Sequence, residues 1–590
     1  MKKIILAIFM LIPGYLGAVD AILKYSCEEI KLGKNPWRTI EKKILILTEN
    51  GRDRYGTQRI NFDDEKEKIE ILYARTITES GDTLPVPQNA INIVTPGEIE
   101  DYPRFSNHKR LEIAFTGARP GSELEFKVKI TSSEETKKAD DLFTFRERIP
   151  VEQKILRVLV PEEMVFSYKI SDEGVKVEKK NEGNIKVYTF KVQNLPEIKH
   201  TTSYYWGNPY LPPKYLISPY VEYTTYQNWD EFNLELKTKY EKALKLALKK
   251  ISAEEKFLDF YKKIKLIDLD YEITGFTPLD LEEALKSNVA TEAEKAVLLT
   301  AFLQKYRSTN PRIVLIYNYE RSRETSLPGY HNFHKILIIN GDSIMDPGVD
   351  IGEIKTKRFS GYHAEDIFEE KEITIKGDSS SIVSASAILN LKDKSVKFTI
   401  EADGFSGISA KYRLYYTPKQ WRRDLIRRVI GVFGTVDSVI DSKLPDPFDL
   451  ENKFQVSGSG KIEHIGIMQN KYWIITFPYF FFQILNLPDF SVESRTEPYF
   501  IPQPLELILN YTLVFPENTE IVGLPDEFES ARGPFHLSET VKKSENKIDI
   551  KIMLRIDRRY IPTELFSELE IIKKEFGSQE RRIIVLKRMF

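Results

Sequence analysis

Apolar and polar residues alternate through most of the first third of the chain. The segments 111–115 and 124–130 show this period of two on either side of a Pro-Gly turn, and residues 79–82 give a second turn signal. Such alternation is typical of strands with one buried face. Because no helical pattern separates these strands, residues 22–200 predict a β-sandwich and not a parallel sheet.

The hydrophobic spacing becomes helical in the middle of the chain. Asn228 or Asp230 can cap a long helix, and a second helical pattern covers residues 253–264. A short helix is predicted from Thr277, because Pro278 suits a first helical turn. The middle segment therefore begins with several helices.

A capping box marks the central helix of this segment. Thr291 and Glu294 stand in the T-x-x-E relation, so that the helix is predicted to begin at Glu292 and to bury one side. The continuous apolar run at residues 312–317 then predicts a buried strand. Helices followed by a sheet make residues 201–370 an α+β core.

Strand patterns return after residue 370. They dominate to the end, so residues 371–590 predict one or more β-rich domains, with a late helix at 563–575. Thr417 and Pro418 resemble a capping box with proline at the first helical position. The apolar run 472–482 contains a proline and is too short to cross a bilayer, which favours a buried strand or a domain contact.

The N-terminal residues have the pattern of an export signal. Met1-Lys2-Lys3 precedes an apolar run at 4–12, and small residues follow near Ala18, which predicts a signal peptide over residues 1–21. We therefore expect a periplasmic or secreted protein without a transmembrane span in the mature chain. An uncleaved anchor stays open, although the run is shorter than the roughly 20 residues that a span needs.

Composition and motifs narrow the functional classes. The 86 Lys and Arg residues nearly balance the 88 Asp and Glu residues, so no global charge favours a nucleic acid partner. Cys27 is the only cysteine, which excludes an intramolecular disulfide, and its acidic neighbours favour a structural role. No nucleotide-binding or common zinc motif occurs, so we expect neither a cofactor nor a metal.

Three short motifs in the core resemble a known family. They are Glu294-Lys295-Ala296 with Leu298-Leu299, Phe333-His334, and Met345-Asp346-Pro347. They are similar to the transglutaminase-like branch of the papain-like cysteine hydrolases and transferases. The resemblance implies a site in which cysteine opens a helix, histidine begins a strand and aspartate on the next strand orients the histidine. Glu292, His334 and Asp346 then occupy these positions. The thiol nucleophile is missing, so the resemblance implies no thiol-based acyl transfer.

The flanking segments resemble the companions of such cores. Residues 73–82 and 110–122 are similar to the domain of unknown function that often precedes the core in exported bacterial proteins, and the tail resembles the β-rich domain that follows it. The predicted fold is thus α+β and multidomain. Its parts are an N-terminal β-sandwich, a transglutaminase-like core and a C-terminal β-rich domain.

The turn between the two later site strands decides whether His334 and Asp346 meet. A two-residue turn at Asn340-Gly341 pairs His334 with Pro347 and puts Asp346 on the opposite face. A three-residue turn or a bulge brings both to one face. If the family's histidine-aspartate pair survives, we expect the second arrangement.

Three functions remain open from the sequence. The first is a non-catalytic binding or scaffolding protein of the cell envelope, whose partner is an extended peptide, a protein or a glycan. The second is a divergent hydrolase or a metal-dependent enzyme that uses Glu292, His334 and Asp346. In the third, Glu292 is only a first-turn acid and His334 is a core residue.

Three other polar residues near the motifs receive structural interpretations. His331 is expected to lie exposed in a loop, and His363 is expected at the surface. The Thr291 hydroxyl is expected to be committed to capping and not free to act as a nucleophile.

Overall fold

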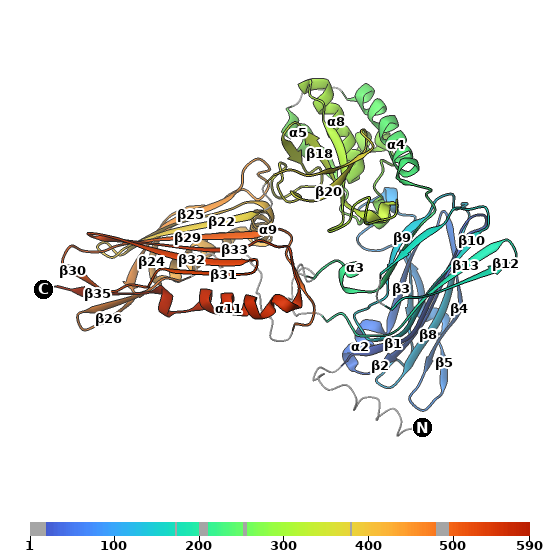
Figure 1. Cartoon of the computed structure of the whole chain (residues 1–590), viewed down its shortest axis with the longest axis horizontal. Coiled ribbons are helices and arrows are strands. Elements are labelled where there is room, and N and C mark those ends of the chain that lie inside the picture. The colour runs from blue at the N-terminus through green and yellow to red at the C-terminus, as the bar shows by residue number, and fades with distance from the viewer. Residues whose placement is uncertain are drawn as a thin grey trace.

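A computed structural model describes residues 19–171, 174–199, 211–251, 256–377, 380–478 and 495–589. Its strand-rich parts follow one another along the chain, from blue through green to red in Figure 1. The expected multidomain, strand-rich architecture is confirmed at this level. Residues 1–18 of the predicted signal peptide and residues 479–482 of the apolar run lie outside the described residues.

The N-terminal part is built on an eight-stranded sheet that curves beside two small sheets. In spatial order its strands are β12 (Lys176–Glu182), β13 (Ile185–Leu195), β10 (Val151–Pro161), β1 (Ala21–Lys31), β2 (Trp37–Ile46), β8 (Glu123–Ser132), β4 (Glu67–Ile77) and β5 (Thr83–Pro85). The predicted turn at residues 79–82 lies between β4 and β5, and Gly81 adopts a φ of 93° there.

Two three-stranded sheets complete this part. One has the order β3 (Thr57–Asp63), β7 (His108–Ala114), β6 (Ile91–Val94), and the other has the order β11 (Ser167–Ile170), β14 (Tyr220–Thr224), β9 (Asp140–Thr144). A short helix, α2 (Glu49–Tyr55), and a 3-10 turn, η2 (Pro103–Phe105), lie in the connections. β14 belongs to this part by pairing, although its residues fall within the segment 201–370 expected to form the core.

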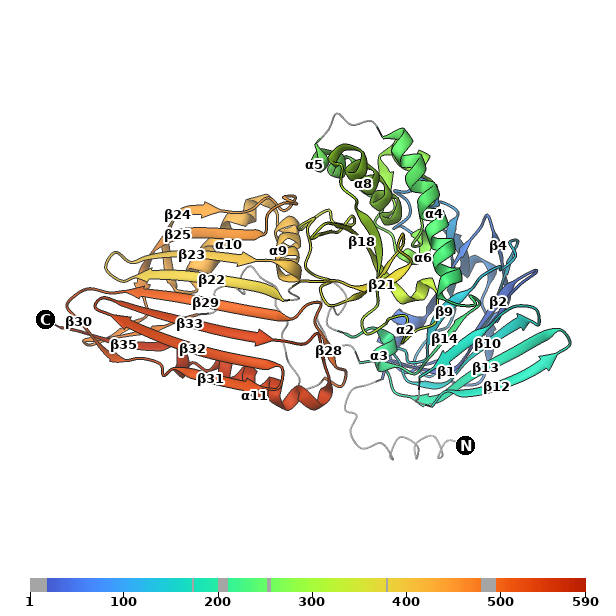
Figure 2. The same ribbon diagram turned by 45° about the horizontal axis from the view of Figure 1, so that its top comes forward.

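The central part places helices on one face of an antiparallel five-stranded sheet (Figure 2). Its helices are α4 (Trp229–Lys250), α5 (Phe257–Lys263), α6 (Tyr271–Thr274), α7 (Leu281–Ser287) and α8 (Glu292–Arg307). The short helix α3 (Lys214–Ile217) precedes β14 and contacts β9 of the N-terminal part. The sheet order is β19 (Ser343–Met345), β18 (Phe333–Asn340), β17 (Arg312–Tyr317), β20 (His363–Asp366), β21 (Lys371–Thr374). The sheet follows the helices, as predicted for an α+β segment.

Two helix predictions in this part need correction. α7 begins at Leu281 and not near Thr277, because the Asp280 side chain accepts hydrogen bonds from the Glu282 and Glu283 backbone N–H groups and so supplies the cap. α8 starts at Glu292 with the predicted capping box, but residues 293–303 are buried on every side. A helix buried on every side has no polar stripe facing solvent, and the charged side chains of Glu294 and Lys295 are buried in ion pairs.

The hairpin between β18 and β19 has a register that the sequence did not predict. Asn340 pairs with Ser343, so Gly341 and Asp342 form the loop, and continuing this register puts Asp346 level with Leu337. On its other edge β18 carries a bulge at His334, because Tyr317 pairs with Phe333 and Ile316 pairs with Lys335. The arrangement expected to bring His334 and Asp346 together is not formed.

The C-terminal part contains a second eight-stranded sheet, drawn in yellow to red in Figure 2. Its order is β24 (Gly434–Lys443), β25 (Phe454–Ile465), β23 (Ser395–Ala402), β22 (Ser381–Asn390), β29 (Leu505–Val514), β33 (Lys547–Ile556), β32 (Phe535–Ser544), β31 (Phe528–Arg532). A four-stranded sheet packs with it and has the order β26 (Ile467–Gln469), β27 (Tyr472–Thr476), β35 (Ile583–Arg588), β30 (Thr519–Gly523). Its helices are α9 (Gly404–Tyr416), α10 (Lys419–Gly431) and α11 (Phe566–Gly577).

The predicted capping box at Thr417 is wrong. The Thr417 hydroxyl donates a hydrogen bond back to the Arg413 carbonyl at 2.8 Å, because Thr417 ends α9. Pro418 is therefore the N-cap of α10, without a side-chain cap. Within the described ranges, no helix combines the length and apolar character needed to span a membrane.

Candidate functional site

The site is built at the N-terminus of α8, where Glu292 opens the helix. Thr291 caps this end, since its hydroxyl accepts a hydrogen bond from the Glu294 N–H at 3.3 Å. The Thr291 side chain is buried and committed to this cap, as expected. The Glu292 carboxylate accepts hydrogen bonds from the Tyr271 hydroxyl at 2.6 Å and from the Ile336 N–H at 3.3 Å.

Lys335 joins Glu292 to Asp346. Its ammonium nitrogen lies 3.0 Å from Glu292 Oε1 and 3.0 Å from Asp346 Oδ1. Asp346 Oδ1 also accepts a hydrogen bond from the Gly348 N–H at 2.8 Å, whereas Asp346 Oδ2 is buried and has no hydrogen-bond partner in the described part of the chain. We call Glu292, Lys335 and Asp346 the carboxylate-lysine cluster. The structure thus brings together two of the three predicted site residues, with a lysine between them.

Burial and charge act in opposite directions on the cluster. Burial raises the pKa of Glu292 above its ordinary value, although the Lys335 charge opposes this. Burial would lower the pKa of Lys335, but the charges of Asp346 and Glu292 outweigh it and raise that pKa. The lysine is therefore held as an ammonium between two carboxyl groups.

His334 does not join this cluster. Its ring packs against the rings of Phe359 and Tyr362, with centroid separations of 5.7 Å and 5.6 Å. Burial lowers the pKa of His334 to about 4, and none of the described residues forms a hydrogen bond with Nδ1. Because β18 bulges at His334, the side chain of the next residue, Lys335, is the one that contacts Glu292 at the start of α8. The grouping of Glu292, His334 and Asp346 expected from the sequence is therefore corrected to Glu292, Lys335 and Asp346.

A second buried lysine lies one helical turn further along α8. The Lys295 ammonium sits 4.1 Å from the centroid of the Tyr261 ring and 3.8 Å from Asp350 Oδ1. Burial lowers the pKa of Lys295 to about 8. Neither lysine was predicted as a site residue from the sequence, and the signal for Lys295 was its i, i+3 spacing from Glu292, which places both on one side of the helix.

Gly348 closes the cluster on one side. A Cβ atom placed on this glycine would lie 2.5 Å from Lys335 Nζ and 2.9 Å from Glu292 Oε2. Any larger residue would have to displace the charged groups. The absence of a side chain at position 348 is therefore part of how the cluster packs.

The N-terminal part of the molecule reaches the same helix end. Arg104, in η2, donates two hydrogen bonds to the buried Glu294 carboxylate, at 2.9 Å and 2.5 Å. Glu294 also accepts from the N–H groups of Thr291 at 2.9 Å and Asp280 at 2.6 Å. The Glu294 carboxylate therefore completes the α8 capping box and accepts a hydrogen bond from Asp280, the N-cap of α7. Through Arg104 it also links α8 to the N-terminal part.

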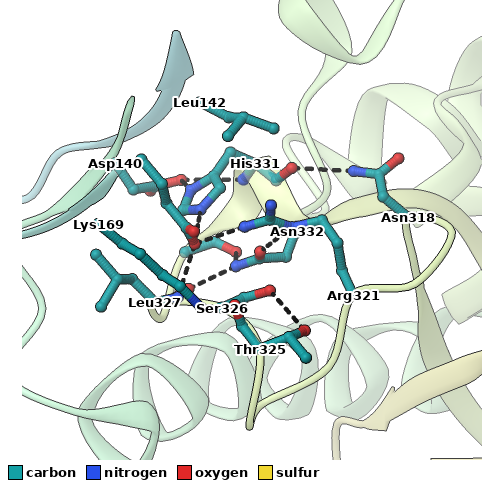
Figure 3. A network of polar contacts seen from close by, with 12 residues as sticks. Asp140, Leu142, Lys169, Asn318, Arg321, Thr325, Ser326, Leu327, His331 and Asn332 are labelled. Atoms are coloured by element: carbon teal, nitrogen blue, oxygen red, sulfur yellow. Dashed lines mark hydrogen bonds and ion pairs between the residues drawn. The ribbon is translucent and has the colours of Figure 1, made fainter. Parts of the chain in front are cut away.

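A second buried network lies where η3 (Tyr330–Asn332) contacts strands β9 and β14 (Figure 3). His331 Nδ1 lies 2.8 Å from Asp140 Oδ2, and Nε2 lies 2.8 Å from Glu222 Oε1. Arg321 Nη2 lies 2.6 Å from the same Glu222 oxygen. The His331 side chain is only 7% exposed, so the expected loop position at the surface is wrong. His363 is 44% exposed and pairs with Glu372, in keeping with a surface residue.

The His331 network predicts a pH-dependent stability. Burial would lower the pKa of His331, but hydrogen bonds to Asp140 and Glu222 outweigh it and raise the pKa. A histidine with a raised folded-state pKa stabilises the fold below its unfolded pKa, and this contribution is lost as pH rises through the folded value. Chemical unfolding from about pH 6 to about pH 9 should show wild type losing stability relative to His331→Gln.

Neighbouring groups around His331 set the control for that experiment. Asp141 is also buried, and burial raises its pKa to about 6. Because both proteins keep Asp141 and Arg321, the difference between them isolates most of the His331 contribution. A difference that stays constant over this pH range would contradict the prediction.

No group of three or more His, Cys, Asp and Glu side chains in the described ranges has an arrangement that could hold a metal. In the carboxylate-lysine cluster, the Lys335 ammonium occupies the position between the two carboxylates where a cation would bind. Cys27 is half-buried in β1, and burial raises the pKa of its thiol, so it is a poor nucleophile.

Two family models match parts of the chain. A domain of unknown function, DUF3857, matches residues 37–199, and a second, DUF3858, matches residues 472–586. The search of curated proteins found no match. The chain therefore carries a DUF3857 domain before the central part and a DUF3858 domain after it.

Solved structures give the fold of the whole chain. The crystal structure of a "putative protease" from Parabacteroides distasonis ATCC 8503 matches with a TM-score of 0.67 and 13% identity, covering 96% of this chain and 99% of that one. An M1 zinc metallopeptidase from Deinococcus radiodurans matches with a TM-score of 0.20 and 12% identity over 36% of this chain and 44% of that one. The first match establishes a shared fold along nearly the entire length, and the second is too low to carry an argument.

Proposed function

We propose that this chain is an exported protein with a transglutaminase-like core that has lost thiol catalysis and serves as a binding or scaffolding protein of the cell envelope. One observation carries the proposal. Glu292 stands at the capped N-terminus of the buried helix α8, where the resembling family has its cysteine, and it forms an ion pair with Lys335, which also pairs with Asp346.

The chemistry of the cluster supports the loss of thiol catalysis. A helix N-terminus stabilises a thiolate, and a nearby imidazole moves the proton during acyl transfer. Glu292 supplies a carboxylate in place of the thiolate, and the imidazole of His334 lies among aromatic rings away from it. A carboxylate bound to an ammonium and a tyrosine hydroxyl is a weak nucleophile.

The architecture supports a role in binding. The fold is shared along nearly its whole length with a protein named as a "putative protease", and proteases act on peptide chains. Exposed aromatic side chains lie on α9 and in the loop before β25, with the Tyr415 ring 5.4 Å from that of Phe448. Tyr412 lies one turn earlier on α9. Burial raises the pKa of Tyr412, and the negative charge of Asp350, which is the ion-pair partner of Lys295, raises it further. Aromatic rings of this kind stack on sugars and on peptide side chains.

Rebuilding the family site tests the loss of thiol catalysis. We would replace Cys27 by Ser, so that any thiol is new, and add Glu292→Cys with Lys335→His. Wild type should neither cleave denatured casein nor incorporate dansylcadaverine, and the rebuilt variant should gain iodoacetamide-sensitive activity of either kind. The reason is that a thiol at this helix end has a depressed pKa, and a histidine at 335 can take its proton.

Two controls define the outcome. Glu292→Cys alone, with Lys335 retained, should be alkylated quickly but should turn over poorly, because it lacks a proton acceptor. Casein cleavage by wild type that disappears in Glu292→Ala would overturn the non-catalytic proposal. A rebuilt variant without any gain would mean that the site is no longer transglutaminase-like.

The aromatic surface gives a prediction for binding. Peptidoglycan sacculi contain both glycan and peptide and can be sedimented with the protein. Tyr415→Ala and Phe448→Ala, which remove side chains 43% and 46% exposed, should each weaken co-sedimentation by about tenfold. Tyr472→Ala, at a 37% exposed tyrosine on β27, should leave binding unchanged. Equal retention of all three variants and wild type would contradict this assignment.

A further inference from the structure

The carboxylate-lysine cluster holds an amine and two carboxyl groups in contact and largely away from water. The side chains of Lys335, Glu292 and Asp346 are 17%, 11% and 1% exposed. Two carboxylates against one ammonium leave a net negative charge in a buried site. Condensation of the amine with one carboxyl group would remove one buried charge of each sign, and buried charges are costly.

The two oxygens of Asp346 differ in their contacts. Oδ1 is bound by the Gly348 N–H and by Lys335, whereas Oδ2 is buried and has no hydrogen-bond partner among the described residues. A buried anionic oxygen without a hydrogen bond is costly. Loss of this oxygen as water would remove that cost, and the amine that would replace it is already in contact with the carboxyl group.

We propose that Lys335 and Asp346 condense into an intramolecular isopeptide bond, with Glu292 as the proton carrier. The bond from Lys335 Nζ to Asp346 Cγ forms, the bond from Cγ to Oδ2 breaks, and one water leaves. No oxidant, nucleotide or metal is needed. This inference concerns a reaction of the chain with itself, so it goes beyond the binding role proposed above.

The contacts supply the first proton transfer and a donor for the charge that develops on Asp346. The Lys335 ammonium first passes a proton to Glu292 Oε1 at 3.0 Å, which frees the nitrogen lone pair. The amine then adds to Asp346 Cγ, and the Gly348 N–H, 2.8 Å from Oδ1, stabilises the negative charge that develops on this oxygen. Glu292 delivers this proton to Oδ2, takes the second extra proton from the nitrogen and delivers it to the same oxygen, which departs as water. Glu292 ends as the carboxylate that it was, and its carboxyl group must turn from Nζ toward Oδ2 for these transfers.

The surroundings hold these groups in position. The Tyr271 hydroxyl fixes Glu292 through Oε2 at 2.6 Å, which leaves Oε1 directed at Lys335. Gly348 allows the close approach, since a Cβ atom there would meet Lys335 Nζ at 2.5 Å. Contact between reacting groups before reaction replaces an encounter step and can be worth several powers of ten in rate. The product would link β18 to the segment after β19 in a chain that has a single cysteine.

Mass spectrometry of the purified full chain tests the proposal. Wild type should be lighter than its sequence mass by one water molecule, whereas Lys335→Arg, which keeps the positive charge but cannot condense, should have its full sequence mass. Both proteins are prepared identically, so any processing of the N-terminus cancels. Trypsin does not cut after an acylated lysine, so wild type should yield residues 324–355 as one peptide that lacks one water.

Glu292→Gln tests the proton carrier. This variant keeps the size of residue 292 but cannot carry the proton, so it should retain its full mass while a thermal unfolding scan confirms that it folds. Wild type at full mass after days at neutral pH would overturn the bond, and a condensed Glu292→Gln would overturn the role of Glu292. Neither measurement depends on binding or hydrolysis, so a failure here is distinct from a failure of the proposed function.

Discussion

Glu294→Ala should destabilise the contact between the N-terminal and central parts by about 3–5 kcal/mol, because it removes one partner from a buried ion pair. The Glu294 side chain is fully buried, and it bonds Arg104 twice. It also receives the backbone N–H groups of Thr291 and Asp280. The substitution leaves a guanidinium and these donors without an acceptor.

Local measurements suit this prediction better than a single unfolding midpoint, since a multidomain chain need not unfold in one step. Hydrogen exchange of residues 279–296 should become faster in Glu294→Ala. Glu282→Ala is the matched control, because Glu282 is also a first-turn acid but is 65% exposed. The loss of stability caused by Glu282→Ala should stay within about 0.5 kcal/mol. Equal exchange in both variants would show that the Arg104 contact does not hold the cap.

Lys411→Met should destabilise the contact between the central and C-terminal parts by about 3 kcal/mol, because three buried carbonyl groups lose their donor. The Lys411 side chain is 1% exposed on α9. Its ammonium donates hydrogen bonds to the carbonyl groups of Gly352 at 3.0 Å, Asp449 at 2.6 Å and Asn452 at 2.6 Å. Methionine has a similar length and keeps the packing, so the loss reports on hydrogen bonding.

The readout for Lys411→Met is the protection of two loops. Ile354 donates its N–H to the Leu450 carbonyl at 2.9 Å, and this hydrogen bond should open more often once the lysine is gone. Lys453→Met is the matched control, because Lys453 is 53% exposed and forms a surface ion pair with Glu401. If the Ile354 amide is equally protected from hydrogen exchange in both variants, the three hydrogen bonds of Lys411 do not stabilise this contact.

Local sequence rules predicted the helix that organises the site. The capping box of Thr291 and Glu294 depends on residues three apart, so it could be read without knowledge of the fold, and α8 begins where it predicts. The C-terminal strand pattern and the helix α11 followed in the same way from local periodicity. The same capping-box rule failed at Thr417, because this residue ends the preceding helix α9 and does not begin α10.

The identity of the third cluster residue depended on geometry that the sequence does not encode locally. His334 matched the family motif by residue type, but a single bulge in β18 makes Lys335 the residue that reaches Glu292. His331 was misplaced for a related reason. Its partners Asp140 and Glu222 are 191 and 109 positions away, and only the packing of separate parts brings them together.

The pairing of β14 between β9 and β11 limits how the molecule can be divided. This strand is followed directly by α4 of the central part, but its neighbours on both edges come from residues 140–144 and 167–170. Cutting the chain at residue 200 would remove β14, the middle strand of this sheet, from the N-terminal fragment. The C-terminal fragment would then begin with β14 as an unpaired strand. Gene fusions and deletion series should therefore keep residues 220–224 with the N-terminal part, and exchange of the core alone between relatives would produce fragments prone to aggregation.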